Sequence, residues 1–146
     1  MRLQGRYKLT EHLGSGSMAE VWAARDRASG DVVAVKVISE LMALSDHARK
    51  RFEREMLAIG SVHHANVVAL LGHGQVEDGR PFLVMEYCEG ETLQQYMDGH
   101  GRLGVRGTLL LVTQVLDGLS AAHEAGIIHR DLKPANILLA FLPSGD

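Results

Sequence analysis

The amino-acid sequence predicts an α+β fold, with strands concentrated in the first half of the chain and helices in the second. A β-branched run, Val32 to Ile38, follows the turn residues Ser29-Gly30-Asp31, which is typical of a strand leaving a tight turn. In the second half, apolar residues recur at the i, i+3, i+4 and i+7 spacing of one helical face: Val112, Val115, Leu116 and Leu119. The two halves therefore favour different secondary structures.

Five strands are expected in the first half, each apolar or β-branched and bounded by turn residues. The expected strands are Tyr7–Leu13, Met18–Arg25, Val32–Ile38, Val67–Val76 and Pro81–Tyr87. Local propensity in the second of them, from Ala19 on, is also compatible with a helix. The last two are separated by Glu77-Asp78-Gly79, which predicts a turn between them.

Helices are expected mainly after the strands. Asp46 is a candidate N-cap for a helix that runs to about Ser61. A short helix is expected near Thr92 to Asp98, and a longer one over Val105 to Ala125. Ile137 to Leu139 is expected to form a last short strand.

Composition narrows the class of protein. The 146 residues are 46% hydrophobic and 23% charged with a net charge of −3, so neither nucleic acid nor an anionic membrane is expected as a partner. A single cysteine, Cys88, excludes an internal disulfide and fits a reducing compartment. The apolar runs are too short for a membrane span, and Met1 to Gly5 lacks the apolar core of a secretion signal. A cytoplasmic location is therefore expected.

The segment His129 to Asn136, which reads His-Arg-Asp-Leu-Lys-Pro-Ala-Asn, carries the strongest chemical signal. Asp131 can accept the proton of an attacking hydroxyl, and Lys133 can neutralise a migrating phosphoryl group. Asn136 can hold a metal ion. This spacing of an acid, a cation and an amide predicts phosphoryl transfer to an alcohol.

A glycine-rich turn, Gly14-Ser15-Gly16-Ser17-Met18-Ala19, lies between the first two expected strands. Glycines let backbone N–H groups approach phosphate oxygens without a Cβ in the way. The pattern G-x-G-x-x-A also fits a dinucleotide-binding turn, which would need a helix next and an acidic residue about twenty positions on. A flexible turn without function is a third interpretation.

Lys36 lies inside an apolar strand, where an ammonium group is costly unless it is paired. On the helix expected after Asp46, Phe52, Glu55 and Ile59 share one face, so we expect Glu55 to pair with Lys36. The alternative is a surface lysine and a solvated glutamate. Glu53 is the competing carboxylate, but it lies off this face.

These motifs together resemble the protein kinases, and in detail the Ser/Thr kinases of bacteria. The resemblance implies a five-stranded antiparallel N-lobe sheet with one regulatory helix over residues 1–86. It implies a hinge and the start of a mainly helical C-lobe over residues 87–146. The chain ends before the Asp-Phe-Gly segment that kinases carry next.

The resemblance also implies roles for individual residues. Lys36 would hold the α- and β-phosphates of ATP and Glu55 would orient it, while Asp131 and Lys133 would act on the reacting groups and Asn136 would bind Mg²⁺. The residues expected around ATP are Leu13, Gly14, Ser15, Gly16, Ser17, Val21, Ala34, Lys36, Met85, Glu86 and Cys88. Ala19 departs from the third glycine of the family pattern.

The expected function is that of an ATP-dependent protein kinase acting on Ser or Thr hydroxyls of a protein substrate. We expect residues 1–146 to be impaired in catalysis, because the sequence lacks Asp-Phe-Gly. The alternative is a non-catalytic kinase-like module that binds nucleotide or a partner protein. An apolar face on Val105 to Ala125 would favour association through the incomplete C-lobe. An oxidoreductase built on the dinucleotide turn would leave Lys36 and the Asp131 segment unexplained.

Overall fold

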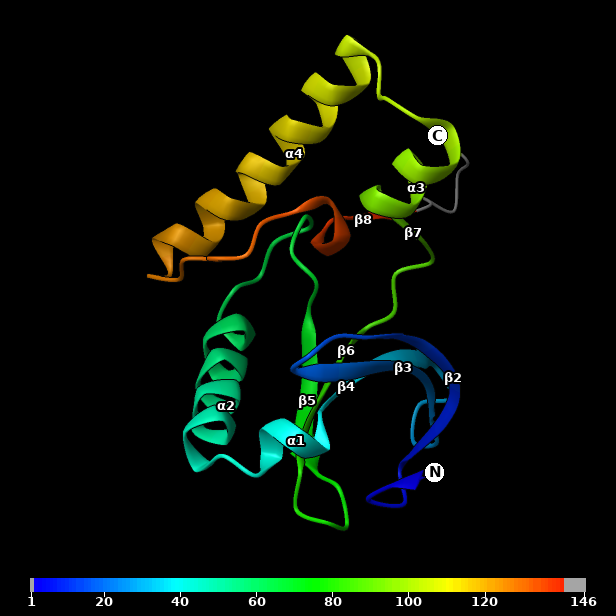
Figure 1. Cartoon of the computed structure of the whole chain (residues 1–146), viewed down its shortest axis with the longest axis vertical. Coiled ribbons are helices and arrows are strands. Elements are labelled where there is room, and N and C mark those ends of the chain that lie inside the picture. Colours follow the sequence, from blue (N-terminus) through cyan, green and yellow to red (C-terminus); the bar gives the residue numbers. More distant parts are fainter. Residues whose placement is uncertain (1, 141–146) are drawn as a thin grey trace. The chain divides into compact units, whose positions relative to one another are not determined.

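The computed structural model describes residues 2–140, which fold into two compact units (Figure 1). The first unit holds the chain up to Ser61 together with Val68–Tyr87. The second holds Val62–Val67 and the chain from Cys88 onward. The chain thus leaves the first unit after Ser61 and re-enters it at Val68.

An antiparallel sheet in the order β1-β2-β3-β4-β6-β5 forms the first unit. Its strands are β1 (Arg2–Leu3), β2 (Tyr7–Ser15), β3 (Ala19–Asp26), β4 (Val32–Ile38), β5 (Leu70–Gln75) and β6 (Pro81–Glu86). All five predicted strands are present, and the two-residue β1 extends the sheet beyond β2. The predicted start of the fourth strand at Val67 is wrong, because Val67 donates its N–H to the carbonyl of His64 in a turn.

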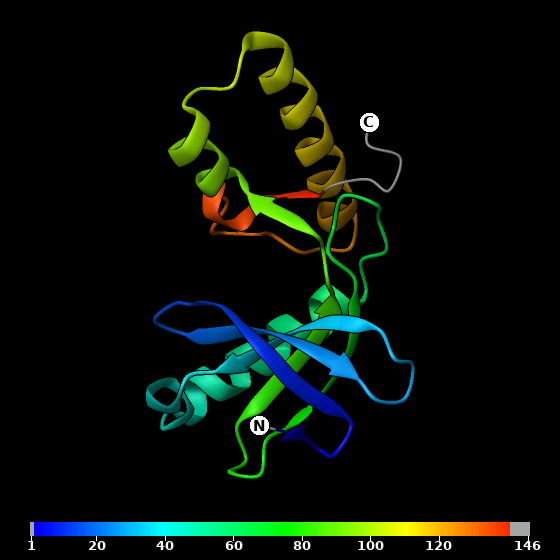
Figure 2. The ribbon, with the colours of Figure 1, turned by 90° about the vertical axis from the view of Figure 1, so that its right-hand side faces the viewer.

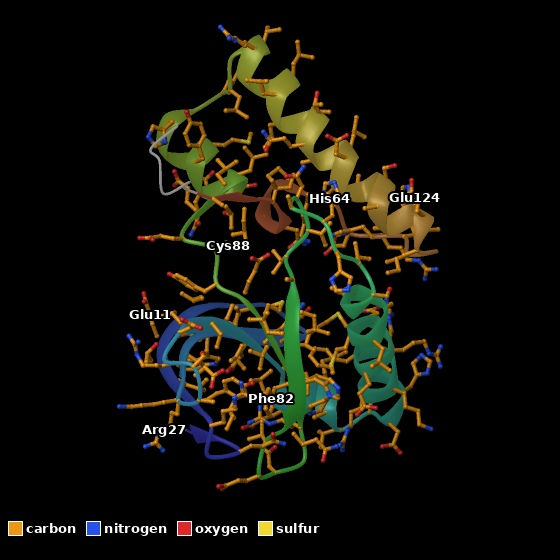
Figure 3. The ribbon with its side chains drawn as sticks, turned by 180° about the vertical axis from the view of Figure 1, so that it is seen from behind. Glu11, Arg27, His64, Phe82, Cys88 and Glu124 are labelled. Carbon is orange, nitrogen blue, oxygen red and sulfur yellow. The ribbon has the colours of Figure 1, made fainter. Side chains whose placement is uncertain are left out.

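One core of the first unit lies on the face of the sheet that carries Val33, Val35 and Val84. Phe82, labelled in Figure 3, is fully buried in it. The Phe82 ring meets the Tyr7 ring edge-on, with 6.1 Å between centroids. Alternation along β4 therefore turns Val33, Val35 and Val37 toward this core and leaves Ala34, Lys36 and Ile38 for the other face.

The second core lies between the sheet and α2 (Asp46–Gly60), which follows the short α1 (Glu40–Ala43). Phe52 and Met56 of α2 pack there with Ile38 and Leu83 of the sheet. The predicted N-cap is off by one residue. Ser45, not Asp46, is extended, and its hydroxyl accepts the N–H of Ala48 at 3.2 Å.

The second unit contains α3 (Leu93–His100), α4 (Val105–Glu124), the 3₁₀ turn η1 (Pro134–Asn136) and a ribbon of β7 (Gly90–Thr92) with β8 (Leu138–Ala140). The two strands lie side by side in Figure 2. Sequence patterns predict both helices and β8, shifted by one residue, but not β7. Gly90 has a φ of +148°, and a Cβ there would collide with the carbonyl of Leu139.

The long helix α4 packs on the segment Val62–Val67. Asn66 donates its side-chain amide to the carbonyl of Gln114 at 3.0 Å, and the buried Gly118 allows the close approach of the Asn66 backbone. Much of the rest of α4 is apolar and exposed, including Leu109, Leu110 and Leu116. None of the helices within residues 2–140 combines the length and hydropathy needed to cross a membrane.

Candidate active site

The segment His129 to Asn136 lies between α4 and β8 in the second unit. The residues that follow Asn136 are held by two neighbours. Strand β8 pairs with β7, and Leu93 at the start of α3 donates its N–H to the carbonyl of Ile137 at 2.8 Å. The η1 turn closes with a bond from the Asn136 N–H to the carbonyl of Lys133 at 2.9 Å. This scaffold holds the predicted catalytic residues on a short, ordered loop.

Asp131 is fixed at every polar group except one. Its N–H donates to Nδ1 of His129 at 3.1 Å, and its carbonyl accepts the side-chain amide of Asn136 at 2.8 Å. Its carboxylate oxygen Oδ2 receives the same amide at 3.2 Å and lies 3.4 Å from Nζ of Lys133. Within the described residues, Oδ1 has neither a hydrogen-bond nor an ion-pair partner, and the side chain is 68% exposed. The loop therefore presents one anchored and one open carboxylate oxygen.

Arg130 gives the loop its sharp reversal. Its φ is +66°, in the left-handed region that non-glycine residues rarely occupy. The hydrogen bond from Asp131 to His129 spans this residue and stabilises the reversal. The sequence predicts one site for Asp131, Lys133 and Asn136, and the structure brings these three residues together.

Asn136, the predicted metal ligand, has one side-chain atom without a hydrogen bond among the described residues. Its Nδ2 is used by Asp131, but Oδ1 accepts no hydrogen bond from the described residues. An amide oxygen is a ligand that suits Mg²⁺, which is usually held by few protein oxygens together with phosphates and water. Among residues 2–140 there is no group of three or more His, Cys, Asp or Glu side chains placed to hold a metal. The residues thus fit Mg²⁺ shared with a phosphate ligand, not a closed protein cage.

The glycine turn is in the first unit, between β2 and β3. It closes with a bond from the Gly16 N–H to the carbonyl of Ala19 at 2.9 Å. Neither Gly14 nor Gly16 has a positive φ, and a Cβ on either would meet no protein atom closer than 4.0 Å. The fold itself does not require glycine at these positions. Because Ala19 begins a strand and not a helix, the dinucleotide-binding interpretation of this turn is wrong.

Next to this turn, four predicted ATP contacts share one face of the sheet. The register pairs Val21 of β3 with Lys36 of β4, and Ala34 of β4 with Met85 of β6. Alternation along β4 places Ala34 and Lys36 on the same face, that of the α2 core. Lys36 is half-buried there.

The expected ion pair between Lys36 and Glu55 is absent from the described residues. Glu55 is 58% exposed, and its Oε1 accepts a hydrogen bond from Nε of Arg51 at 3.1 Å. The predicted face was wrong because Met56, and not Ile59, fills the core position next to Phe52. This choice turns Glu55 outward. The i, i+4 spacing of Arg51 and Glu55 is the signal that could have predicted the observed partner.

The remaining predicted contacts lie in both units. Leu13, Ser15 and Ser17 are exposed in the first unit. Glu86 lies at the end of β6, and its carboxylate already accepts a hydrogen bond from the N–H of Ala69 at 2.8 Å. Cys88 is half-buried and belongs to the second unit.

Comparison with known proteins identifies relatives along nearly the whole chain. The family model described as "Protein kinase domain" matches residues 7–142. A probable serine/threonine-protein kinase, pknA2 of Bifidobacterium longum, is 39% identical over 140 residues, which cover 94% of this chain and 18% of the relative. The serine/threonine-protein kinase PrkC of Bacillus subtilis is 36% identical over 138 residues, covering 94% and 21%.

Solved structures give the same result. The crystal structure of the Mycobacterium tuberculosis PknI kinase domain matches with a TM-score of 0.81 and 32% identity, covering 96% of this chain and 56% of that one. The chain spans about a fifth of the length of the two curated relatives and just over half of this kinase domain. The family model covers most of this chain, and the chain belongs to the protein kinase family.

Proposed function

We propose that this protein is an ATP-dependent protein kinase that transfers the γ-phosphoryl group of ATP to a Ser or Thr hydroxyl of a protein substrate. The names of its relatives support this specificity. The observation that carries the proposal is the different surroundings of the two carboxylate oxygens of Asp131. One carboxylate oxygen is anchored by Asn136 and Lys133, and the other is open to a hydroxyl.

In the proposed reaction, the substrate hydroxyl donates a hydrogen bond to Oδ1 of Asp131. Its oxygen attacks the γ-phosphorus, its proton passes to Asp131, and the bond from the γ-phosphorus to the bridging oxygen of ADP breaks. Lys133, 3.4 Å from the anchored oxygen and exposed, can neutralise charge on the moving phosphoryl group. Lys at this position fits a Ser/Thr kinase more than a Tyr kinase.

The roles in binding ATP and Mg²⁺ that the family implies are assigned residue by residue, within each unit. In the first unit, backbone N–H groups of residues 14–19 other than that of Gly16, which donates to the carbonyl of Ala19, would approach the phosphates. Lys36 would bind the phosphates, and Met85 and Glu86 would border the adenine. In the second, Cys88 would border the adenine and Asn136 would bind Mg²⁺. The bound Mg²⁺ would neutralise phosphate charge during transfer. Without a Cβ at positions 14 and 16, phosphate oxygens could approach the backbone of the turn closely.

Glu55 would orient Lys36 only after it exchanges its ion-pair partner Arg51 for Lys36. It must leave Arg51 before it can pair with Lys36. An exposed i, i+4 ion pair of this kind contributes about 0.3–0.5 kcal/mol, so loss of the Arg51 pair costs little. The exchange also requires Glu55 to turn from its outward orientation on α2.

The test is phosphate transfer by the full protein from radiolabelled Mg·ATP to a protein substrate, followed by identification of the labelled amino acid. We expect labelled Ser or Thr, and a rate about 10² to 10⁴ times lower for Asp131→Asn. Asn66→Ala, which removes a similar side-chain hydrogen bond outside the loop, is the matched control. Binding of ATP without transfer would instead support a non-catalytic nucleotide-binding module.

A finer proposal concerns residues 1–146 by themselves. They contain Asn136 but not the Asp-Phe-Gly aspartate that kinases use as a second Mg²⁺ ligand. We expect this stretch to transfer phosphate slowly, and its exposed apolar residues on α4 to favour association. Full activity of a monomeric 1–146 fragment would contradict both expectations.

A further inference from the structure

Ser39 connects the glycine turn to the helix that follows β4. Its hydroxyl donates to the carbonyl of Ser17 at 3.2 Å, and its N–H donates to the carbonyl of Met18 at 2.9 Å. The same hydroxyl accepts the N–H of Met42 at 3.3 Å, as the N-cap of α1. A hydroxyl can fill both roles, because it carries one donor and two acceptor sites.

The tip of the turn has few other attachments. Gly16 closes the turn locally on Ala19, and residues 15–18 are all exposed. The two bonds from Ser39 are thus the ones that tie the carbonyls of Ser17 and Met18 to a more distant part of the described chain. Loss of the hydroxyl would free the carbonyl of Ser17.

We propose that Ser39 is a positioning residue that holds the glycine turn in the geometry that binds the phosphates of ATP. This inference rests on the proposed function, because it assumes that residues 14–19 bind nucleotide. Ser39 acts through the turn and needs no contact with the ligand. The hydroxyl works as donor toward the turn, whereas the cap of α1 needs it only as acceptor.

Substitutions at Ser39 can separate these two roles. Ser39→Asp keeps an acceptor for the Met42 N–H but cannot donate to Ser17, and an Asp is a good N-cap. Ser39→Ala loses both roles, and Ser39→Thr keeps both. Ser45→Ala is the matched control, because Ser45 caps α2 and has no bond to the turn.

The experiment measures hydrogen exchange of the backbone amides of residues 14–19 without nucleotide, and the KM for ATP and kcat, all in the full protein. For Ser39→Ala and Ser39→Asp we expect faster exchange in the turn and a KM for ATP about two- to tenfold higher, the range that one neutral hydrogen bond gives. kcat should change less than KM. Ser39→Thr and Ser45→Ala should match the unsubstituted protein in both readouts.

Two outcomes overturn the proposal. In the first, Ser39→Asp keeps slow amide exchange in the turn and a normal KM for ATP, whereas Ser39→Ala does not. Ser39 would then act only as the N-cap of α1. Alternatively, Ser45→Ala could change the turn as much as Ser39→Ala does. If the unsubstituted protein binds no ATP, the proposed function fails by itself, and the exchange data still decide whether Ser39 orders the turn.

Discussion

The side-chain amide of Asn136 donates to two oxygens of Asp131, the backbone carbonyl at 2.8 Å and the carboxylate Oδ2 at 3.2 Å. A residue expected only to bind a metal ion therefore also holds the proposed catalytic carboxylate. Because the two roles use different atoms, Nδ2 for Asp131 and Oδ1 for a cation, substitutions can separate them.

Asn136→Asp should lower kcat about 10- to 100-fold, because it keeps oxygen ligands for Mg²⁺ but loses the donors and sets a second carboxylate beside Asp131. The measurement is kcat as a function of Mg²⁺ concentration, compared with Asn66→Ala. If Asn136 acted as a metal ligand alone, Asn136→Asp would stay active. Recovery of full kcat at high Mg²⁺ would therefore contradict the positioning role.

His129 is expected to act as an acceptor for the Asp131 N–H across the strained Arg130. His129→Phe keeps a ring and removes the acceptor, whereas His129→Asn keeps an oxygen that can accept the same N–H. We expect kcat to fall for both variants. The fall should be about tenfold smaller for His129→Asn, because one hydrogen bond contributes up to about a factor of ten.

His64 offers a matched control for this test, because its Nδ1 accepts the N–H of Asn66 at 3.0 Å in a similar turn outside the loop. His64→Phe should leave kcat unchanged at saturating ATP. Equal losses for His129→Phe and His129→Asn would show that ring packing, and not the hydrogen bond, is what His129 contributes.

Asp26 and Arg6 should make the stability of the first unit depend on pH. Arg6 donates two hydrogen bonds to the buried Asp26 carboxylate, at 2.8 and 2.7 Å, and this lowers the pKa of Asp26 to about 2. A carboxyl group with a lowered pKa in the folded state stabilises that state above its usual pKa of 3.8, and this stabilisation is lost as the pH falls toward 2.

Urea unfolding of the full protein at pH 7 and at pH 2.5 tests this. Asp26→Asn should be less stable than the unsubstituted protein at pH 7, and the difference should shrink at pH 2.5. Asp98→Asn, on the exposed surface of α3, serves as control and should show no such difference at either pH. A deficit of Asp26→Asn that stays constant across this range would indicate lost packing in place of a lost charge interaction.

Sequence patterns predicted the parts of this fold that depend on local periodicity. β4 is a single β-branched run, and its observed bounds are the predicted ones. α4 repeats its apolar spacing over several turns, and its observed end differs from the predicted one by one residue. β7 has three residues, Gly90–Thr92, and exists only because β8 pairs with it from far along the chain. Such a pairing leaves no local pattern to detect.

The candidate site shows the same division. The His129 to Asn136 segment is a local motif, and the structure brings its predicted residues together. The orientation of Glu55 depends on whether Met56 or Ile59 fills the core next to Phe52, and the spacing from Phe52 allows both. Sequence could therefore place Glu55 on α2 but could not decide which way it faces.

The competition between Arg51 and Lys36 for Glu55 leads to a last prediction. If Glu55 must orient Lys36 for ATP to react, Glu55→Gln should lower kcat/KM for ATP, because a neutral amide pairs weakly with an ammonium group. Arg51→Ala should instead leave kcat/KM unchanged or raise it about twofold, since it removes a competing pair of about 0.3–0.5 kcal/mol. Both positions are exposed on α2, so neither change should alter stability much. Steady-state kinetics of the two variants beside Lys36→Ala would decide the point. An unchanged kcat/KM for Glu55→Gln, with a large loss for Lys36→Ala, would show that Lys36 works without Glu55.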